Sequence, residues 1–230
     1  MNLAFYTCFY GSNGNASFSI PSAPSSKYKC YYFTNNDTIM ERLAGTPWIG
    51  VYEGDKKTTD DVKESCMMGK HVKTQPHLYE ELAKYDYLCF LDSKLNKVSE
   101  TFVEEYIQKY FVEQSYALLL RQHWFITSNN VWDEFHESML QERYRVDCAK
   151  YMEYIEKQVE KGFRETTASH CACGFLIRNM RHPVTKELGR VWYEHIQECG
   201  IQDQISFFFV KQMFECYLYA FVEEPFLKGT

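Results

Sequence analysis

The chain has no apolar run that approaches the roughly 18 residues of a membrane-spanning helix. It also has no excess of positive charge, because 25 Lys and Arg residues stand against 31 Asp and Glu and give a net charge of −6. The basic residues are scattered, whereas binding to a nucleic-acid backbone needs them clustered. The sequence therefore predicts a protein with neither a membrane span nor a nucleic-acid partner.

A disulfide framework, a secretion signal and an interdomain linker are missing as well. The nine cysteines are odd in number and irregularly spaced. The first residues carry no basic leader, and their apolar run is too short and too polar for a signal peptide. No stretch rich in Pro, Gly and Ser divides the 230 residues. We therefore expect one domain, 1–230, in the reducing cytoplasm.

What the sequence does contain is a series of short apolar runs that alternate with helical patterns. The runs predict strands at 3–9, 29–34, 48–52, 87–91, 116–120 and 173–177. Helices are expected at 38–43, 58–69, from 76 onward, and at 99–111, 129–162, 191–199 and 205–216. The alternation is typical of an α/β protein with a mostly parallel, Rossmann-like central sheet flanked by helices.

One apolar run ends abruptly in Asp92 and Ser93. Open α/β sheets bind ligands at the carboxyl ends of their strands, and a carboxylate there can hold a divalent cation. Lys70 and Lys73, with two nearby histidines, could meet the anionic groups that such a cation accompanies. The pattern predicts a metal-assisted site for a phosphorylated ligand. The alternative is an ordinary helix start, with Ser93 or Ser99 as the cap.

Further polar residues follow the other predicted strands. Polar tips occur at 7–11, 34–37 and 92–93, and they would share one rim if the three strands are parallel neighbours. A fourth tip carries Arg121, His123 and Trp124, which suits a pocket for an acceptor. A half-exposed loop with a packed tryptophan is the alternative for that tip.

Two later residues are also candidates. His170 begins the segment His-Cys-Ala-Cys, but no second pair with zinc-ligand spacing follows, so we do not expect structural zinc. His170 can instead approach the site from the opposite side of the cleft. Asp203 precedes an aromatic helix and is either the cap of that helix or a general base that accepts a proton from an attacking hydroxyl.

These residues resemble a known family. Lys70 and Lys73, the strand end Leu91-Asp92-Ser93-Lys94-Leu95 and the late segment Asp203-Gln204-Ile205-Ser206-Phe207 together resemble GT-A glycosyltransferases with a one-carboxylate metal motif. Stretches 2–11, 69–74 and 201–211 are similar to N-terminal glycosyltransferase domains of multi-domain chlorovirus enzymes. The resemblance covers nearly the whole chain. It implies the GT-A fold and a UDP-sugar-dependent transferase that helps to build the glycan of a viral capsid protein in the host cytoplasm.

The resemblance also implies roles for individual residues. It assigns the nucleotide-sugar donor to Tyr6, Thr7, Phe9, Asn35, Lys70, Lys73, Leu91, Asp92 and Ser93, with the two lysines near the diphosphate. Asp92 and His170 would hold Mn²⁺ or Mg²⁺. It further implies transfer of L-rhamnose with inversion, with Asp203 as the base. Most members of the family carry Asp-x-Asp, whereas Lys94 occupies the third position here, so Lys94 could supply part of the positive charge itself.

Two alternatives to this function stay open. One is a retaining transferase that uses a UDP-hexose such as UDP-glucose or UDP-galactose. The other is a non-catalytic module that binds a nucleotide or a sugar and recruits a partner enzyme. The missing second aspartate favours the module, whereas the cluster of polar strand tips favours catalysis.

Overall fold

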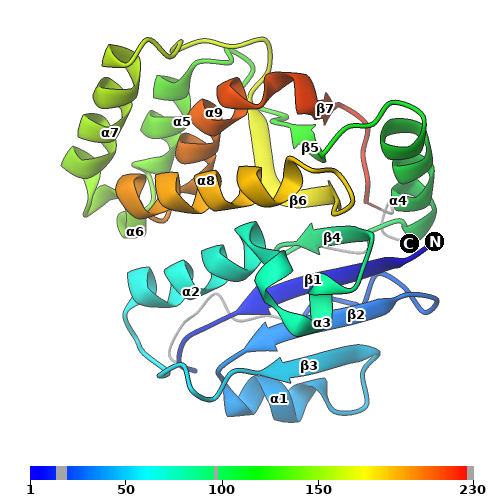
Figure 1. The fold of residues 1–230 in the computed structure, drawn as a ribbon. Helices are drawn as coiled ribbons and strands as arrows, with labels where there is room; N and C mark the ends of the chain where they lie inside the picture. Colours follow the sequence, from blue (N-terminus) through cyan, green and yellow to red (C-terminus); the bar gives the residue numbers. More distant parts are fainter. Residues whose placement is uncertain (14–19, 96–97, 227–230) are drawn as a thin grey trace.

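The computed structural model describes residues 1–13, 20–95 and 98–226. Within these ranges seven strands form one sheet in the order β3-β2-β1-β4-β6-β5-β7 (Figure 1). The strands are β1 (Leu3–Phe9), β2 (Lys29–Thr34), β3 (Trp48–Tyr52), β4 (Tyr87–Leu91), β5 (Leu118–Gln122), β6 (Cys171–Asn179) and β7 (Leu218–Phe221). Strands β3, β2, β1 and β4 are parallel, and β6 runs antiparallel to both of its neighbours. The predicted α/β class with a mostly parallel sheet is confirmed.

The α-helices connect these strands and cover the sheet. They are α1 (Asp37–Leu43), α2 (Val62–Thr74), α3 (Glu80–Ala83), α4 (Glu100–Tyr106), α5 (Val131–Ser138), α6 (Glu142–Arg145), α7 (Cys148–Glu160), α8 (Thr185–Cys199) and α9 (Asp203–Met213). Short 3-10 turns occupy Pro76–Leu78 and Glu215–Tyr217, and a π-helical segment, Ile107–Val112, continues α4. None of the described helices is long and apolar enough to cross a membrane.

Alternate side chains of the strands enter two separate layers of the core. In β1, Leu3 and Phe5 pack with residues of α1 and α4, whereas Ala4 and Tyr6 pack with residues of α2, α8 and α9. This alternation is the two-residue period of a strand, and burial of both faces explains why the runs are apolar throughout. A third cluster joins α5, α6, α7 and α9 beyond the sheet. Figure 1 shows these helices gathered beside β5 and β6.

Several element boundaries differ from the prediction. Helix α2 begins after Asp61, whose side chain accepts hydrogen bonds from two backbone amides, and it continues to Thr74 and not only to Gly69. Lys70 and Lys73 therefore lie on this helix. The predicted helix 129–162 is divided into α5, α6 and α7, and β7 was not predicted. Asn36 caps α1, where the sequence offered Asp37 or Thr38, and Gln202 caps α9, where Asp203 was the candidate cap.

Candidate functional site

A pocket of about 560 Å³ opens at the carboxyl ends of β1 and β4, the edge expected from the sequence. Its walls are the end of β1, one face of α2, the turn after β4, the loop after β5, α5, α6 and the start of α9. Among the predicted site residues, those that line it are Phe9, Lys70, Lys73, Asp92, Ser93, His123 and Asp203. A volume of this size accommodates a small-molecule ligand.

Lys70, Lys73 and Asp203 form a buried ion cluster in one wall of the pocket. The two lysines are three residues apart and so share one face of α2. The Lys73 ammonium lies 2.5 Å and the Lys70 ammonium 2.9 Å from Oδ2 of Asp203 at the first turn of α9. Lys73 and Asp203 are only 3% and 4% exposed. The cluster therefore contains two positively charged ammonium groups and one negatively charged carboxylate.

The cluster changes how readily Asp203 accepts a proton. Burial alone raises the pKa of its carboxyl group, but the ammonium groups of Lys70 and Lys73 outweigh burial and hold that pKa below its ordinary value. The pKa of Lys70 is raised, because Asp203 and Asp92 together outweigh the effect of its own burial. Asp203 is therefore stabilised as a carboxylate. Its predicted role as the catalytic base stays a prediction.

Asp92 follows β4 directly and is exposed at the pocket. Its backbone amide donates to the Gly174 carbonyl at 2.8 Å, and its own carbonyl accepts from the Leu95 amide at 2.9 Å, which closes a turn. No described Lys, Arg or His lies within ion-pair distance of its carboxylate. The Asp92 carboxylate is therefore accessible to a ligand in the pocket.

Gly174 leaves room for the Asp92 carboxylate because it has no side chain. A Cβ atom at position 174 would lie 3.0 Å from Asp92 Oδ2. We expect Gly174→Ala to displace that carboxylate by a few tenths of an ångström and to weaken any cation-dependent binding of UDP several-fold. Isothermal titration of UDP with and without Mn²⁺ measures the effect. Equal cation dependence in the variant and the wild type would contradict this role of Gly174.

The structure does not bring His170 to Asp92. Asp92 pairs with Gly174 of β6, and His170 precedes that glycine by four residues, or about 13 Å of extended strand. His170 Nε2 is instead 2.8 Å from Oε2 of Glu134. Over the residues described, no group of three or more His, Cys, Asp or Glu side chains could hold a metal ion. A cation at Asp92 would therefore need further oxygen ligands, which phosphate groups of the ligand and water can supply, as they do for Mg²⁺ beside substrate phosphates.

Most of the residues predicted to bind the nucleotide from β1, β2 and β4, or directly after them, do not line the pocket. This set was Tyr6, Thr7, Phe9, Asn35 and Leu91, of which Phe9 lines the pocket and the other four are buried away from it. The Tyr6 hydroxyl donates to the backbone carbonyl of Lys73 at 3.1 Å and accepts from Arg178 at 2.9 Å. The Asn35 side chain binds backbone groups of neighbouring loops. Tyr6 therefore supports Lys73 in the pocket wall, whereas Asn35 joins loops outside the pocket.

The residues predicted for an acceptor surround the loop after β5. His123 lines the pocket, and its ring stacks on Trp124 with the centroids 5.0 Å apart. The Arg121 guanidinium lies 4.7 Å from the Trp124 ring and pairs with Glu224 at 2.6 Å. Trp124 is 60% exposed, and Phe125 beside it is 53% exposed and lines the pocket. The loop thus presents aromatic faces at the pocket entrance.

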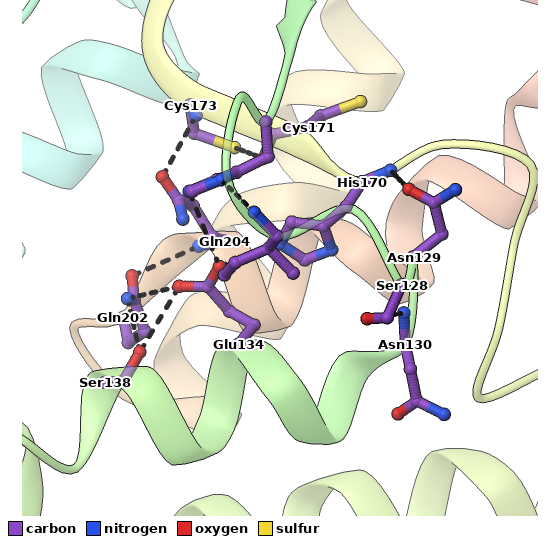
Figure 2. A network of polar contacts seen from close by, with 12 residues as sticks. Ser128, Asn129, Asn130, Glu134, Ser138, His170, Cys171, Cys173, Gln202 and Gln204 are labelled. Atoms are coloured by element: carbon purple, nitrogen blue, oxygen red, sulfur yellow. Dashed lines mark hydrogen bonds and ion pairs between the residues drawn. The ribbon is translucent and has the colours of Figure 1, made fainter.

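Sequence reasoning missed a buried polar network around Glu134 (Figure 2). Glu134 Oε1 accepts from Gln202 Nε2 at 2.9 Å and from Ser138 Oγ at 3.3 Å, and Oε2 is bonded to His170. Glu134, Ser138 and Gln202 all line the pocket. The spacing of Glu134 and Ser138, four residues apart on one helix, was the available signal, because it places two polar side chains on the buried face of α5.

Comparison with known proteins shows which of them share this fold. No protein-family model and no curated protein matches the sequence. Mouse xyloside xylosyltransferase 1 in its apo form is similar in structure, with TM-score 0.53 and 8% identity over 96% of this chain and 85% of that chain. The apo bifunctional glycosyltransferase WbbM has TM-score 0.53 and 9% identity over 95% of this chain and 38% of its own. The chain therefore has the mixed α/β fold of these glycosyltransferases.

Proposed function

We propose that the protein is a glycosyltransferase that moves a sugar from a nucleotide sugar to a hydroxyl group of an acceptor sugar. The observation that carries the proposal is the joint placement of Asp92, Lys70 and Lys73 around one pocket at the carboxyl edge of the sheet. The two structures with the same fold are glycosyltransferases by name, which supports this class. The chain spans 38% of WbbM, so nothing of that protein's two activities is assigned here.

The charges of the pocket suit a diphosphate leaving group. The buried cluster has two ammonium groups and one carboxylate, so it retains positive charge in a site of low dielectric. A departing nucleoside diphosphate develops negative charge, and cations already in place stabilise it without reorganisation. Lys70, whose side chain is 18% exposed, is the more accessible of the two for a phosphate oxygen.

A divalent cation fits beside Asp92 if the diphosphate supplies most of its ligands. When bound, the ion would neutralise charge on the leaving group. Asp92 has no competing described ion pair, and Gly174 leaves its carboxylate room. The requirement for Mn²⁺ or Mg²⁺ is part of the proposal, and Lys94, which also lines the pocket, is a further source of positive charge.

The reaction we propose is a direct displacement. The acceptor oxygen attacks the anomeric carbon, the bond from that carbon to the diphosphate breaks, and the electron pair leaves with the diphosphate. Two buried carboxylates of the pocket, Asp203 and Glu134, are able to accept the proton of the acceptor hydroxyl. UDP as the carrier, L-rhamnose as the sugar, inversion and a viral capsid glycan as the acceptor rest on the sequence resemblance.

The first experiment is calorimetric titration of UDP and, separately, GDP into the purified protein, with and without Mn²⁺. We expect UDP to bind more tightly with the cation present, and a screen of UDP-sugars, beginning with UDP-L-rhamnose, to show release of UDP. Absence of binding by either nucleotide under both conditions would rule out the proposed function.

Replacement of Asp92 separates an enzyme from a binding module. We expect Asp92→Asn to lower turnover at least about a hundredfold, because the side chain that holds the cation near the leaving group is lost. The rate of UDP release from the best donor is the measurement. Asp133→Asn, at an exposed position of α5, is the control with the same charge change. A module is indicated if wild type binds UDP but releases none from any donor.

A further inference from the structure

Glu134 is a second buried carboxylate of the pocket, and it comes from a different wall. It lies on α5, whereas Asp203 begins α9, and both side chains border the same cavity. Glu134 is 3% exposed, so its carboxylate is largely removed from bulk water. A buried carboxylate needs hydrogen-bond donors, and their nature decides what else it can do.

The donors around Glu134 need not carry charge. Gln202 Nε2 and Ser138 Oγ bond to Oε1, and His170 Nε2 bonds to Oε2. His170 Nδ1 is buried and has no partner among the described atoms. A proton on Nδ1 would be a buried donor without an acceptor, so we assign the proton of the hydrogen bond to Glu134 to Nε2. Figure 2 shows the three donors converging on Glu134.

These three hydrogen bonds leave Glu134 able to accept another. A carboxylate offers about four acceptor positions, and Gln202, Ser138 and His170 occupy three of them. Besides His170, His123 is the cationic residue type within ion-pair distance among the described residues, with its Nε2 4.0 Å from Oε2. Burial lowers the pKa of His123 and favours its neutral form. One position of the Glu134 carboxylate is thus available to a hydroxyl group in the pocket.

Asp203 differs from Glu134 in this respect. Its Oδ2 atom is shared by the ammonium groups of Lys70 and Lys73, which stabilise the ionised carboxylate. A carboxylate bound to two cations accepts a further proton less readily than one bound to neutral donors. Of the two carboxylates, Glu134 has the surroundings of a base, and Asp203 has those of a counter-ion for the diphosphate lysines.

The loop after β5 places an acceptor surface next to Glu134. His123 and Phe125 line the pocket from this loop, and their rings meet edge to face with the centroids 4.6 Å apart. The exposed Phe125 offers an apolar face on which the C–H groups of a sugar ring can pack. A sugar on this surface has hydroxyl groups at its edge, within a pocket that Glu134 also borders.

We propose that Glu134 is the catalytic base on the acceptor side of the reaction. The acceptor hydroxyl transfers its proton to the Glu134 carboxylate while its oxygen forms the bond to the anomeric carbon. The bond between that carbon and the diphosphate breaks, and its electron pair leaves with the diphosphate. His170, Gln202 and Ser138 are positioning residues that hold the carboxylate. The inference rests on the proposed function and on an inverting displacement.

The test compares Glu134→Gln with Asp203→Asn in the full chain, at a temperature where circular dichroism shows both folded. The donor is the UDP-sugar found in the screen, and the acceptors are methyl glycosides of hexoses and pentoses. If none of them is used, hydrolysis of the donor, with water as the acceptor, is measured instead. We expect Glu134→Gln to lower kcat about 10²- to 10⁴-fold while the Kd for UDP stays within about twofold. Asp203→Asn should lower kcat less than Glu134→Gln does, although it removes the counter-ion of Lys70 and Lys73. Glu153→Gln, exposed on α7, is the matched control.

The opposite results overturn the inference. Transfer by Glu134→Gln within about tenfold of wild type, or loss of UDP binding together with transfer, would show that Glu134 is not the base. If Glu134→Gln does not fold, Glu134→Ala with added sodium formate decides, because formate restores transfer only where a missing base caused the loss. If wild type binds neither UDP nor GDP, with or without Mn²⁺, the proposed function fails, and this inference fails with it.

Discussion

Asp203→Asn is expected to lower the free energy of unfolding by about 3–5 kcal/mol, because removal of one partner leaves buried charge uncompensated. The substitution leaves Lys73, which is 3% exposed, and the partly buried Lys70 without their counter-ion. The asparagine can still accept a hydrogen bond from one of them, but it carries no charge. Chemical denaturation followed by circular dichroism at neutral pH measures the difference.

The same substitution changes how stability depends on pH. The pKa of Asp203 is lowered in the folded protein, so its contribution to stability is fully present above its unfolded pKa of about 4. That contribution is lost as the pH falls through the lower, folded pKa. We expect wild type to lose stability below pH ~4 more steeply than Asp203→Asn does.

Asp133→Asn is the control for both measurements, because Asp133 is exposed on α5. It should change the free energy of unfolding by no more than about 1 kcal/mol, the usual limit for a charge in the first turn of a helix. A loss below about 1 kcal/mol for Asp203→Asn would contradict the buried cluster and would indicate that water reaches both lysines.

The strands were the most predictable part of the fold. The bounds of β1, β2, β3 and β4 agree with the prediction, because each apolar run ends where polar residues begin. The end of α2 was not predictable from Gly69. A glycine inside a helix costs only about 1 kcal/mol, and packing against α8 outweighs it.

The site was predictable only where it depends on position within one element. Asp92 was expected at a strand end and lies there, exposed at the pocket. The Lys73–Asp203 pair joins residues 130 positions apart, and the Glu134–His170 pair joins residues 36 apart. No local pattern encodes such pairs, because the packing of α5 and α9 decides which polar groups meet. The place of Asp203 at a helix start and the family resemblance therefore suggested a base there, but they could not reveal the lysines that surround it.

The helix that carries Lys70 and Lys73 depends on a very close contact with α8, and Gly189→Ala should disrupt it. A Cβ at position 189 would lie 2.2 Å from the backbone carbonyl oxygen of Thr74. Both atoms are fixed to helix backbones, so a local shift cannot relieve the contact. The two helices must separate by roughly 1 Å to bring the Cβ and the Thr74 oxygen to an ordinary C···O distance. We expect a loss of about 1–3 kcal/mol in the free energy of unfolding, as in other overpacked cores. UDP affinity should fall as well, because α2 moves its lysines.

Gly69→Ala, on α2 itself, is the matched comparison for stability. Its Cβ would lie 3.4 Å from Cys8 Sγ, an ordinary contact, and alanine is favoured over glycine inside a helix by roughly 0.5–1 kcal/mol. The two substitutions are chemically identical, yet we expect opposite signs in thermal denaturation, with Gly189→Ala melting lower and Gly69→Ala at or above wild type. Equal melting temperatures for Gly189→Ala and wild type would mean that the contact between α2 and α8 relaxes freely. The positions of the lysines would then not depend on Gly189.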